Sequence, residues 1–297
     1  MIVDILADIL AFGDVKLHQQ IVFQIADFRI VLNIILTVVV LNPGAQFFDS
    51  FFKDFFDPGF RHNDKRSSLG SGVIIDGERG FILTNAHVIE KASKIKVVLE
   101  DEREFDANIV GADPDSDLAV LQITSPNPLP AIEMGSSDDL MIGETVIAIG
   151  NPFGFSHTVT TGVISAVNRS IRSEERVFLD FIQIDASINP GNSGGPLLNI
   201  NGDLIGINTA IYSRSGGNIG IGFAIPANTI RRVVPQLIKD GRVRRPWFGI
   251  EGYAVDDYLS SRLSLPVQSG ILVFRVLRGG SAERAGIKGA DRVVRYF

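Results

Sequence analysis

Short apolar segments alternate with turn-forming residues over most of the chain, from Gly70 to Ile225. The segments are rich in Val, Ile and Thr, which favour β-strands, and long helical patterns are scarce. Short strands at this spacing are typical of β-barrels. The pattern predicts a mostly β protein with strands over residues 71–75, 81–84, 95–99, 105–110, 118–123, 144–150, 158–167, 181–185, 196–199, 204–210 and 220–225.

The composition and charge of the chain exclude several classes of protein. A chain of 297 residues holds one large domain or two of ordinary size, and 45% apolar content is enough for a packed core. A net charge of −6 and the lack of a basic stripe argue against a nucleic-acid-binding protein. The sequence has no cysteine, which excludes disulfides, thiolate metal sites and a cysteine nucleophile.

Residues 1–69 form a divergent N-terminal segment. Residues 30–41 are its most apolar run, but a membrane-spanning helix needs about 20 such residues, so we expect a buried strand there and no integral membrane span. The rival interpretation of this run is a signal peptide, which would start with basic residues. Acidic residues precede the run instead, so this interpretation is less favoured; they are Asp4, Asp8 and Asp14. Residues 47–56 form a Phe-rich loop, which is expected either to fold back on its own core or to serve in self-assembly.

The sequence changes character near residue 240. A helix is expected over residues 228–240, with Asn228 as its N-cap and Gly241 at its end. Residues 241–246 are rich in Arg and end in proline, which is typical of a linker. The rest of the chain is about half a typical domain in length, so the sequence predicts a smaller C-terminal unit.

A glycine-rich turn around Ser193 carries the strongest chemical signal. Residues 188–198 place three glycines beside this serine and end in an apolar run. Glycine tolerates positive φ and close approach, so such a turn exposes the hydroxyl and directs backbone N–H groups in front of it. Acyl transfer needs both a nucleophilic oxygen and donors for the oxyanion. The same residues also fit an ordinary surface turn, so the interpretation depends on a partner base.

His87 is the best candidate for that base. It follows an expected strand directly, so the sheet would hold it at the edge of a cleft. The remaining histidines lie in the irregular N-terminal region or in an exposed turn, and they are His18, His62 and His157.

Asp117 is the candidate for the acid that orients the base. It directly precedes the apolar segment 118–123, whereas Asp113 and Asp115 are typical of solvated turn residues. The resulting chain order of His, Asp and Ser is that of the chymotrypsin type of triad, and it differs from the order in subtilisins and α/β-hydrolases. On an all-β background, this order predicts a serine hydrolase of the chymotrypsin type.

Five segments of the chain, three of which contain the candidate residues, resemble one known family. The segments are Thr84–Val88, Asp115–Leu121, Ala148–Gly154, Asp185–Leu197 and Gly220–Pro226. Together they resemble the HtrA/Deg family, which are chymotrypsin-like serine proteases of the bacterial envelope and organelles with C-terminal PDZ domains. The resemblance runs from about Gly70 to about Ile287.

The resemblance implies a mostly β fold, with a chymotrypsin-like double six-stranded β-barrel followed by a partial PDZ domain. The trypsin-like protease domain would cover residues 70–240, with the first strand of the N-terminal barrel supplied from 30–41. Residues 241–297 would form an incomplete PDZ domain, because residues 288–297 lack the Gly-Asp pair and the further strands of the family.

The same resemblance assigns the catalytic roles. His87 is the general base, Asp117 orients it and Ser193 is the nucleophile. The backbone N–H groups of Gly191 and Ser193, with Asn192 between them, would form the oxyanion hole.

The pocket for the substrate side chain is expected to be neutral. A trypsin-like enzyme carries an aspartate six residues before its nucleophile, and Ser187 has that position here. Ile188, Ile219 and Ile221 would bound a pocket that prefers small or medium aliphatic side chains. The resemblance also assigns the substrate groove to the segment with Thr209 and Ala210.

Trp247, Phe248, Gly249 and Ile250 resemble the carboxylate-binding loop of a PDZ domain. In such a loop, backbone N–H groups capture the C-terminus of a peptide that adds a strand to the sheet edge. The alternative interpretation is a small β-rich cap without a binding role.

These observations favour an endopeptidase that degrades unfolded or misfolded proteins in envelope protein quality control, by acyl-enzyme chemistry with neither metal nor organic cofactor. The resemblance implies peptide or unfolded-protein substrates, a trimer or higher oligomer, no nucleic acid, and a periplasmic or cell-envelope location. Two alternatives stay open, which are a holdase-type chaperone and an inactive, truncated binding scaffold.

Overall fold

The computed structural model describes residues 34–41, 67–90, 92–151, 158–172, 177–189, 191–211 and 220–289. The chain divides into two compact units, one ending at Val243 and the other beginning at Arg244.

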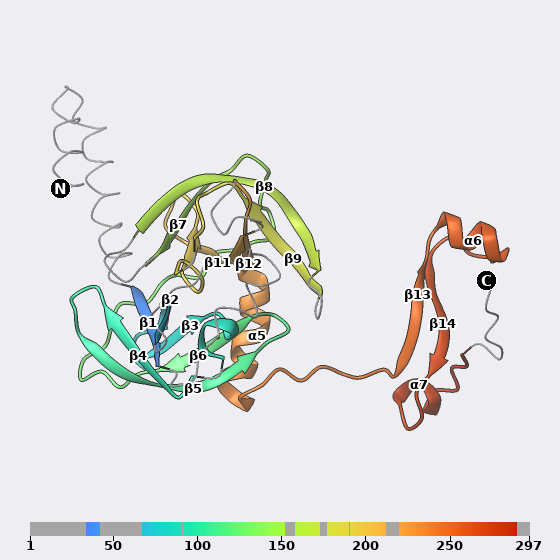
Figure 1. The fold of residues 1–297 in the computed structure, drawn as a ribbon, viewed down its shortest axis with the longest axis horizontal. Coiled ribbons are helices and arrows are strands. Elements are labelled where there is room, and N and C mark those ends of the chain that lie inside the picture. Colours follow the sequence, from blue (N-terminus) through green and yellow to red (C-terminus); the bar gives the residue numbers. More distant parts are fainter. Residues whose placement is uncertain are drawn as a thin grey trace. The chain divides into compact units, whose positions relative to one another are not determined.

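Six strands of the described residues close the first barrel of the larger unit (Figure 1). In order around the barrel they are β1 (Ile35–Leu41), β2 (Ser67–Asp76), β3 (Phe81–Thr84), β6 (Leu118–Gln122), β5 (Glu104–Asp113) and β4 (Lys94–Leu99). Strand β1 pairs antiparallel with both β2 and β4. The apolar run of the N-terminal segment therefore removes the two open edges that the barrel would otherwise have.

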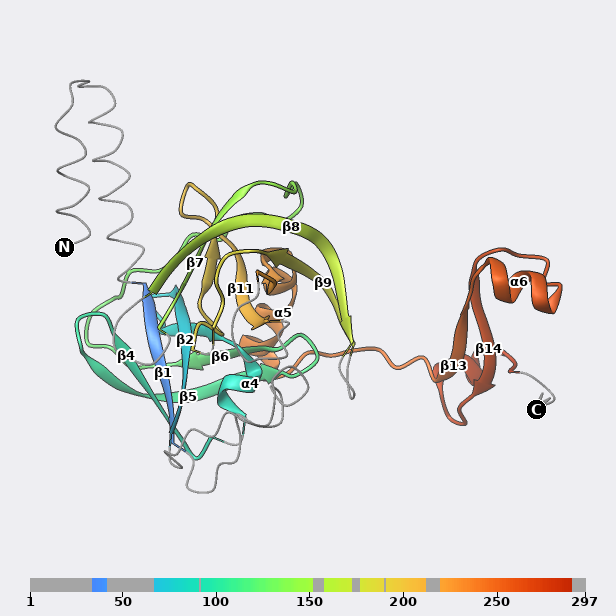
Figure 2. The same ribbon diagram turned by 45° about the horizontal axis from the view of Figure 1, so that its top comes forward.

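The second barrel is likewise closed by six strands within the described residues. Its order is β10 (Pro196–Leu198), β11 (Leu204–Ile211), β12 (Gly222–Pro226), β9 (Val177–Ile184), β8 (Thr158–Arg172) and β7 (Thr145–Gly150). The long strand β8 arches over this barrel (Figures 1 and 2). The expectation of a mostly β, double six-stranded barrel fold is thus confirmed.

Aliphatic side chains fill both barrels. Leu36, Ile82 and Leu121 are fully buried in the first, and Ile164 and Ile184 are fully buried in the second. These residues come from strands far apart in the sequence, so the closed sheets, rather than local pairs, create the core.

The short helix α4 (Ala86–Ile89) follows β3 directly, and Figure 2 shows it beside the first barrel. The longer helix α5 (Ala227–Asp240) packs against β5 and β6 of the first barrel and against β11 and β12 of the second. It buries one face, which carries Ile230, Val233 and Leu237.

The expected N-cap of α5 is wrong. The helix begins one residue earlier, after Pro226, and the Asn228 side chain donates to Asp138 instead of capping the helix. The expected end at Gly241 is confirmed: this residue has a φ of 70°, and its N–H donates to the carbonyl of Leu237.

The smaller unit contains a two-stranded antiparallel sheet of β13 (Ile250–Val255) and β14 (Gly270–Val276). Two short helices accompany the sheet, α6 (Asp257–Leu263) and α7 (Ser281–Arg284). The Asp256 carboxylate caps α6 by accepting from the N–H of Leu259 at 2.7 Å. Several large apolar side chains on the sheet stay exposed, among them Tyr253 and Ile271.

We expect the two neighbouring valines of β1 to differ sharply in their contribution to stability. Val38 is fully buried, and its replacement by Ala removes two buried methyl groups and leaves a cavity, so the free energy of unfolding should fall by about 1.5 to 3 kcal/mol. Val39 is only half-buried, and its replacement by Ala is the matched control with an expected loss below about 1 kcal/mol. Urea unfolding followed by circular dichroism measures both, and equal losses would contradict this role of β1.

Candidate functional site

His87 and Asp117 form a close pair at the end of the first barrel. His87 lies in α4, and Asp117 directly precedes β6. The His87 Nδ1 atom lies 2.9 Å from Oδ1 and 2.8 Å from Oδ2 of Asp117, and the His87 backbone N–H donates to Oδ1 at 3.0 Å. Both side chains are buried, with exposed fractions of 7% and 3%. Because a carboxylate only accepts, this pairing keeps the ring proton on Nδ1 and makes Nε2 the basic nitrogen.

The backbone of Asp117 is also held in place. Asp117 has a φ of 54°, in the left-handed region. Its carbonyl accepts from the Asn85 side-chain amide at 2.9 Å and from the N–H of Ala86 at 3.2 Å. Asn85 is fully buried, so water does not compete for this hydrogen bond of its side-chain amide. The segment with the candidate base therefore fixes the peptide of the candidate acid as well as its side chain.

Asp113, the first of the nearby alternatives, has a local structural role. Its carboxylate accepts from both the backbone N–H and the hydroxyl of Ser116. It thereby stabilises the turn that leads into Asp117.

Thr209 connects this pair to Ser193. The Thr209 hydroxyl donates to Oδ2 of Asp117, and the Thr209 carbonyl accepts from the Ser193 hydroxyl at 2.9 Å. Thr209 belongs to β11 of the second barrel, whereas Asp117 belongs to the first. The structure thus brings all three sequence-predicted residues into one site that spans both barrels.

The Ser193 hydroxyl has a single proton, and in this structure it is directed at the Thr209 carbonyl. Proton transfer to an imidazole requires the hydroxyl to turn toward that ring.

The turn around Ser193 depends on glycines that no other residue can replace without strain. Gly191 and Gly194 have φ values of 102° and 88°. A Cβ added at Gly194 would lie 2.1 Å from the carbonyl oxygen of Ser71. The N–H groups of Asn192 and Gly195 are bound within the turn, to the carbonyls of Asn189 and Asn192.

The expected pocket residues carry no charge where the structure describes them. Ile188 is buried and Ser187 is exposed, while Ile221 is half-buried. Asp185, the nearest carboxylate in the sequence, accepts from the N–H of Val163 at 2.6 Å, which ties it to β8. These features agree with the expectation of a neutral pocket, which stays a prediction.

Several expectations concern residues outside the described part of the chain. Ile219, the side chain of Ala210 and the Phe-rich loop at 47–56 belong to this group. So do the three alternative histidines, His18, His62 and His157.

In the smaller unit, the segment with the expected carboxylate-binding loop is held through its carbonyl groups. The carbonyls of Trp247, Phe248 and Gly249 accept from the Ser281 hydroxyl at 3.2 Å and from the N–H groups of Ala282 and Leu277, each at 2.9 Å. The adjoining Ile250 begins β13. This geometry anchors the segment but does not test capture of a peptide C-terminus, which stays a prediction.

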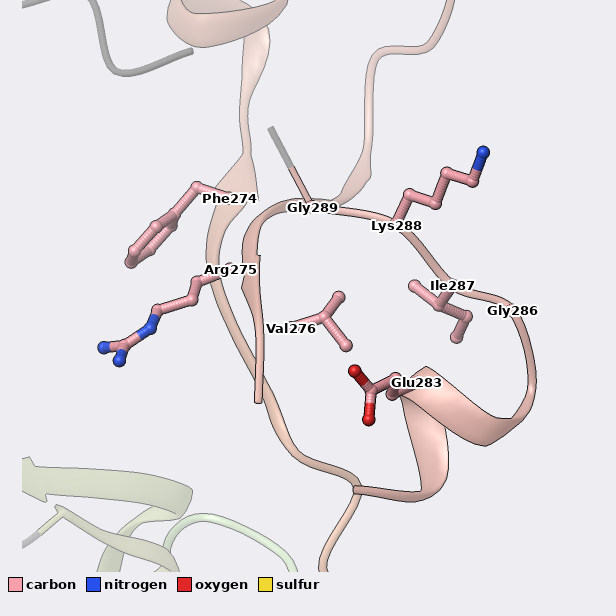
Figure 3. A pocket seen from close by; sticks show the side chains of 8 residues that line it. All are labelled: Phe274, Arg275, Val276, Glu283, Gly286, Ile287, Lys288 and Gly289. Carbon is pink, nitrogen blue, oxygen red and sulfur yellow. The ribbon is translucent and has the colours of Figure 1, made fainter. Parts of the chain in front are cut away.

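A hollow of about 520 Å³ lies between β14 and the segment around α7. Figure 3 shows Val276, Glu283 and Ile287 pointing toward it. Its wall combines apolar groups with charged residues of both signs; the lining residues are Phe274, Arg275, Val276, Glu283, Gly286, Ile287, Lys288 and Gly289.

The described residues contain neither a candidate metal cluster nor a candidate membrane-spanning helix. No group of three or more His, Asp or Glu side chains there is placed to hold a metal ion. Among the same residues, no helix combines the length and the apolar character that a membrane crossing needs.

Sequence reasoning proposed His87, Asp117 and Ser193 but missed the residues that hold them in place. Asn85 lies within the segment Thr84–Val88, but the sequence indicates no role for it. The family resemblance assigns Thr209 to the substrate groove alone. Ser71 and Asn151 are buried and hydrogen-bonded to each other, yet they were not singled out. A polar residue placed in or beside an apolar strand is the signal that could have marked them.

Comparisons with known proteins agree with this geometry. Residues 70–207 match the family model described as "Trypsin-like peptidase domain". The chain is 49% identical over 233 residues to the periplasmic serine endoprotease DegP of Escherichia coli (strain K12), covering 78% of this chain and 49% of that protein. It is 47% identical over 242 residues to the periplasmic pH-dependent serine endoprotease DegQ of the same organism, covering 81% of this chain and 53% of that one.

A solved structure extends this similarity to the fold. The HtrA-type protease AlgW with a decapeptide is 41% identical, with a TM-score of 0.72, over 87% of this chain and 80% of that one. The chain spans about half the length of the curated relatives it matches.

We expect replacement of Asn85 by Ala to lower the free energy of unfolding by about 1 to 3 kcal/mol, because the Asp117 carbonyl loses a buried donor. The matched control is Asn228→Ala, which removes a more exposed side-chain amide bond and should cost less than about 1 kcal/mol. Urea unfolding measures both variants. Equal stability of the two would show that Asn85 does not hold the Asp117 peptide.

Proposed function

This chain belongs to the HtrA-type serine protease family, and on that premise we propose that it is a serine endopeptidase. The observation that carries the proposal is the chain of bonds from His87 through Asp117 and Thr209 to Ser193. It supplies an oriented base, a buried acid and a hydroxyl in one site.

The proposed reaction is acyl transfer through a covalent intermediate. Ser193 Oγ attacks the carbonyl carbon of the peptide bond, while Nε2 of His87 takes the hydroxyl proton. The Asp117 carboxylate, 2.8 Å from Nδ1, stabilises the imidazolium that forms. The C–N bond then breaks, and the imidazolium gives its proton to the leaving amine. Water releases the acyl group from Ser193 by the same steps with His87 again as the base.

The oxyanion is proposed to bind the backbone N–H groups of Gly191 and Ser193, with Asn192 between them. The left-handed glycine conformations of the turn support this role, because they allow neighbouring N–H groups to point to the same side. Such donors lower the barrier only when charge develops on the carbonyl oxygen.

Unfolded or misfolded proteins are the proposed substrates. The substrate groove that the family resemblance assigns to the segment with Thr209 and Ala210 would suit an extended peptide segment, and a compact folded protein rarely presents one. The relatives supply the remaining proposals, since DegP and DegQ are named as periplasmic endoproteases. We accordingly propose a location in the periplasm or cell envelope. A trimer or higher oligomer is proposed from the family resemblance alone. Residues 241–297 would act as a PDZ-type unit.

Replacement of Ser193 by Ala should abolish hydrolysis of casein while leaving the circular dichroism spectrum unchanged, because the nucleophile is lost and the turn is kept. A fluorophosphonate probe should label the wild type and not this variant, since only an activated serine reacts. Ser125→Ala, in an exposed loop, is the matched control and should keep both properties. Hydrolysis by the Ser193 variant would remove this residue from its role, and an unlabelled wild type would favour an inactive scaffold.

Peptides with Val or Ala before the cleaved bond should be hydrolysed faster than peptides with Arg or Lys there, by about 10-fold or more in kcat/KM. The physical reason is that the described pocket residues include no carboxylate to balance a positive charge, and burying an unpaired charge is costly. Matched peptides that differ only at this residue measure the ratio. Faster cleavage after Arg would contradict a neutral pocket.

A further inference from the structure

Ser71 lies within β2 of the first barrel and binds the turn of the second barrel at two points. Its hydroxyl donates to the carbonyl of Gly191 at 2.7 Å, and its backbone N–H donates to the carbonyl of Ser193 at 2.8 Å. The two acceptors stand on either side of Asn192. Ser71 is fully buried, so both bonds are shielded from water. Ser71 of the first barrel therefore holds the turn through the two carbonyl groups that flank Asn192.

The direction of the Ser71 hydroxyl proton is fixed by a second neighbour. The backbone N–H of Asn151 donates to Ser71 Oγ at 2.8 Å. A hydroxyl has one proton to donate, and a neighbour that donates to the oxygen leaves that proton for another acceptor. The proton of Ser71 therefore points at the Gly191 carbonyl.

Asn151 is itself anchored. Its side-chain amide donates to the Thr37 hydroxyl at 2.6 Å, and both residues are buried with exposed fractions of 6%. Thr37 lies on β1, the strand that closes the first barrel. A buried polar chain thus runs from β1 through Asn151 and Ser71 to the turn beside Ser193.

These bonds determine how the peptide between Gly191 and Asn192 is oriented. Its carbonyl binds Ser71, and its N–H donates to the carbonyl of Asn189 at 3.0 Å. Gly191 has a φ of 102°, and a glycine has other conformations of similar energy. The N–H of Gly191 belongs to the preceding peptide and is joined to the held one through φ and ψ of Gly191, so the bonds on the following peptide restrain the direction of that N–H.

We propose that Ser71 is a positioning residue that keeps the N–H of Gly191 aimed at the oxyanion, with Asn151 and Thr37 as its supports. This inference rests on the function proposed above. The donor matters most when charge develops on the substrate oxygen, so loss of the Ser71 hydroxyl should lower kcat and leave KM nearly unchanged.

Two replacements separate the hydrogen bond from packing. Ser71→Ala removes the oxygen, whereas Ser71→Cys keeps a side chain of similar shape with a much weaker donor. The matched control is Ser260→Ala in the smaller unit, where the buried hydroxyl donates to the Val267 carbonyl at 2.7 Å. It loses the same kind of bond away from the turn, and it should keep the kinetic constants of the wild type.

The measurements are kcat and KM on a peptide amide ending in Val, and the Ki of the matching peptide aldehyde. The aldehyde forms a tetrahedral adduct with Ser193 and so reports on the oxyanion donors. In both Ser71 variants, kcat should fall by about 10- to 100-fold, which is at most as large as the fall in kcat when one oxyanion donor is removed. The KM of both variants should stay within about 3-fold of the wild-type value. The aldehyde Ki should rise by the same factor as kcat falls. Thermal melts of each variant confirm that the folded protein is being compared.

Three outcomes would overturn the proposal. A Cys variant with the kinetic constants of the wild type would show that Ser71 acts by packing. A fall in kcat without a matching rise in the aldehyde Ki would place the effect away from the oxyanion. Wild-type kinetic constants in both variants would leave Ser71 without a role in catalysis. By contrast, a wild type that neither hydrolyses the peptide nor reacts with a fluorophosphonate would overturn the proposed function itself.

Discussion

The left-handed backbone of Asp117 is the constraint on which the rest of the site depends. For a residue with a side chain, a φ of 54° costs on the order of 1 to 3 kcal/mol. Bonds from Asn85 and Ala86 to its carbonyl offset this cost. Because the carbonyl is held by the segment that starts α4, the carboxylate meets both Nδ1 and the backbone N–H of His87. The acid, the base and their relative orientation are therefore one local structure within the first barrel.

The proposed nucleophile, Ser193, comes from the second barrel, so the proposed site exists only where the two barrels meet. Thr209 reaches across from β11 to the Asp117 carboxylate, and Ser71 reaches across from β2 to the turn around Ser193. Gly194 packs against the Ser71 carbonyl with no room for a Cβ. These contacts between the barrels are short and buried. The residues of the site, rather than the surrounding loops, therefore fix the position of one barrel relative to the other.

The strands could be predicted from the sequence because their signals are local, and the triad could be proposed because its candidate residues follow a recognised order along the chain. Residues 30–41 were sufficiently apolar and β-branched to indicate the strand that became β1. Strand β8 runs to Arg172, five residues beyond its expected end. The hydrophobicity pattern did not indicate this last part because it carries exposed polar side chains. Its pairing with β9 also shifts register several times, and a regular alternation cannot indicate such bulges.

The supporting residues could not be predicted because their roles depend on distant partners. Ser71 and Gly191 are 120 positions apart, and Asn151 and Thr37 are 114 apart. A serine within an apolar strand marks an unusual position, but the local sequence does not say which atoms it binds. Its function becomes visible only when the fold places a carbonyl and an N–H at hydrogen-bond distance on either side.

Thr209 shows why the site acts as a unit. Its side chain binds the acid, and its carbonyl binds the hydroxyl of the nucleophile. A movement of β11 at this residue therefore changes the environment of Asp117 and of Ser193 together. Because residues that act as a unit have effects that are not additive, the contribution of Thr209 cannot be divided between the two bonds. The same holds for Ser71, whose hydroxyl and N–H bind one turn at two points, so each barrel contacts the proposed catalytic segment of the other through one residue, Thr209 from the second barrel and Ser71 from the first.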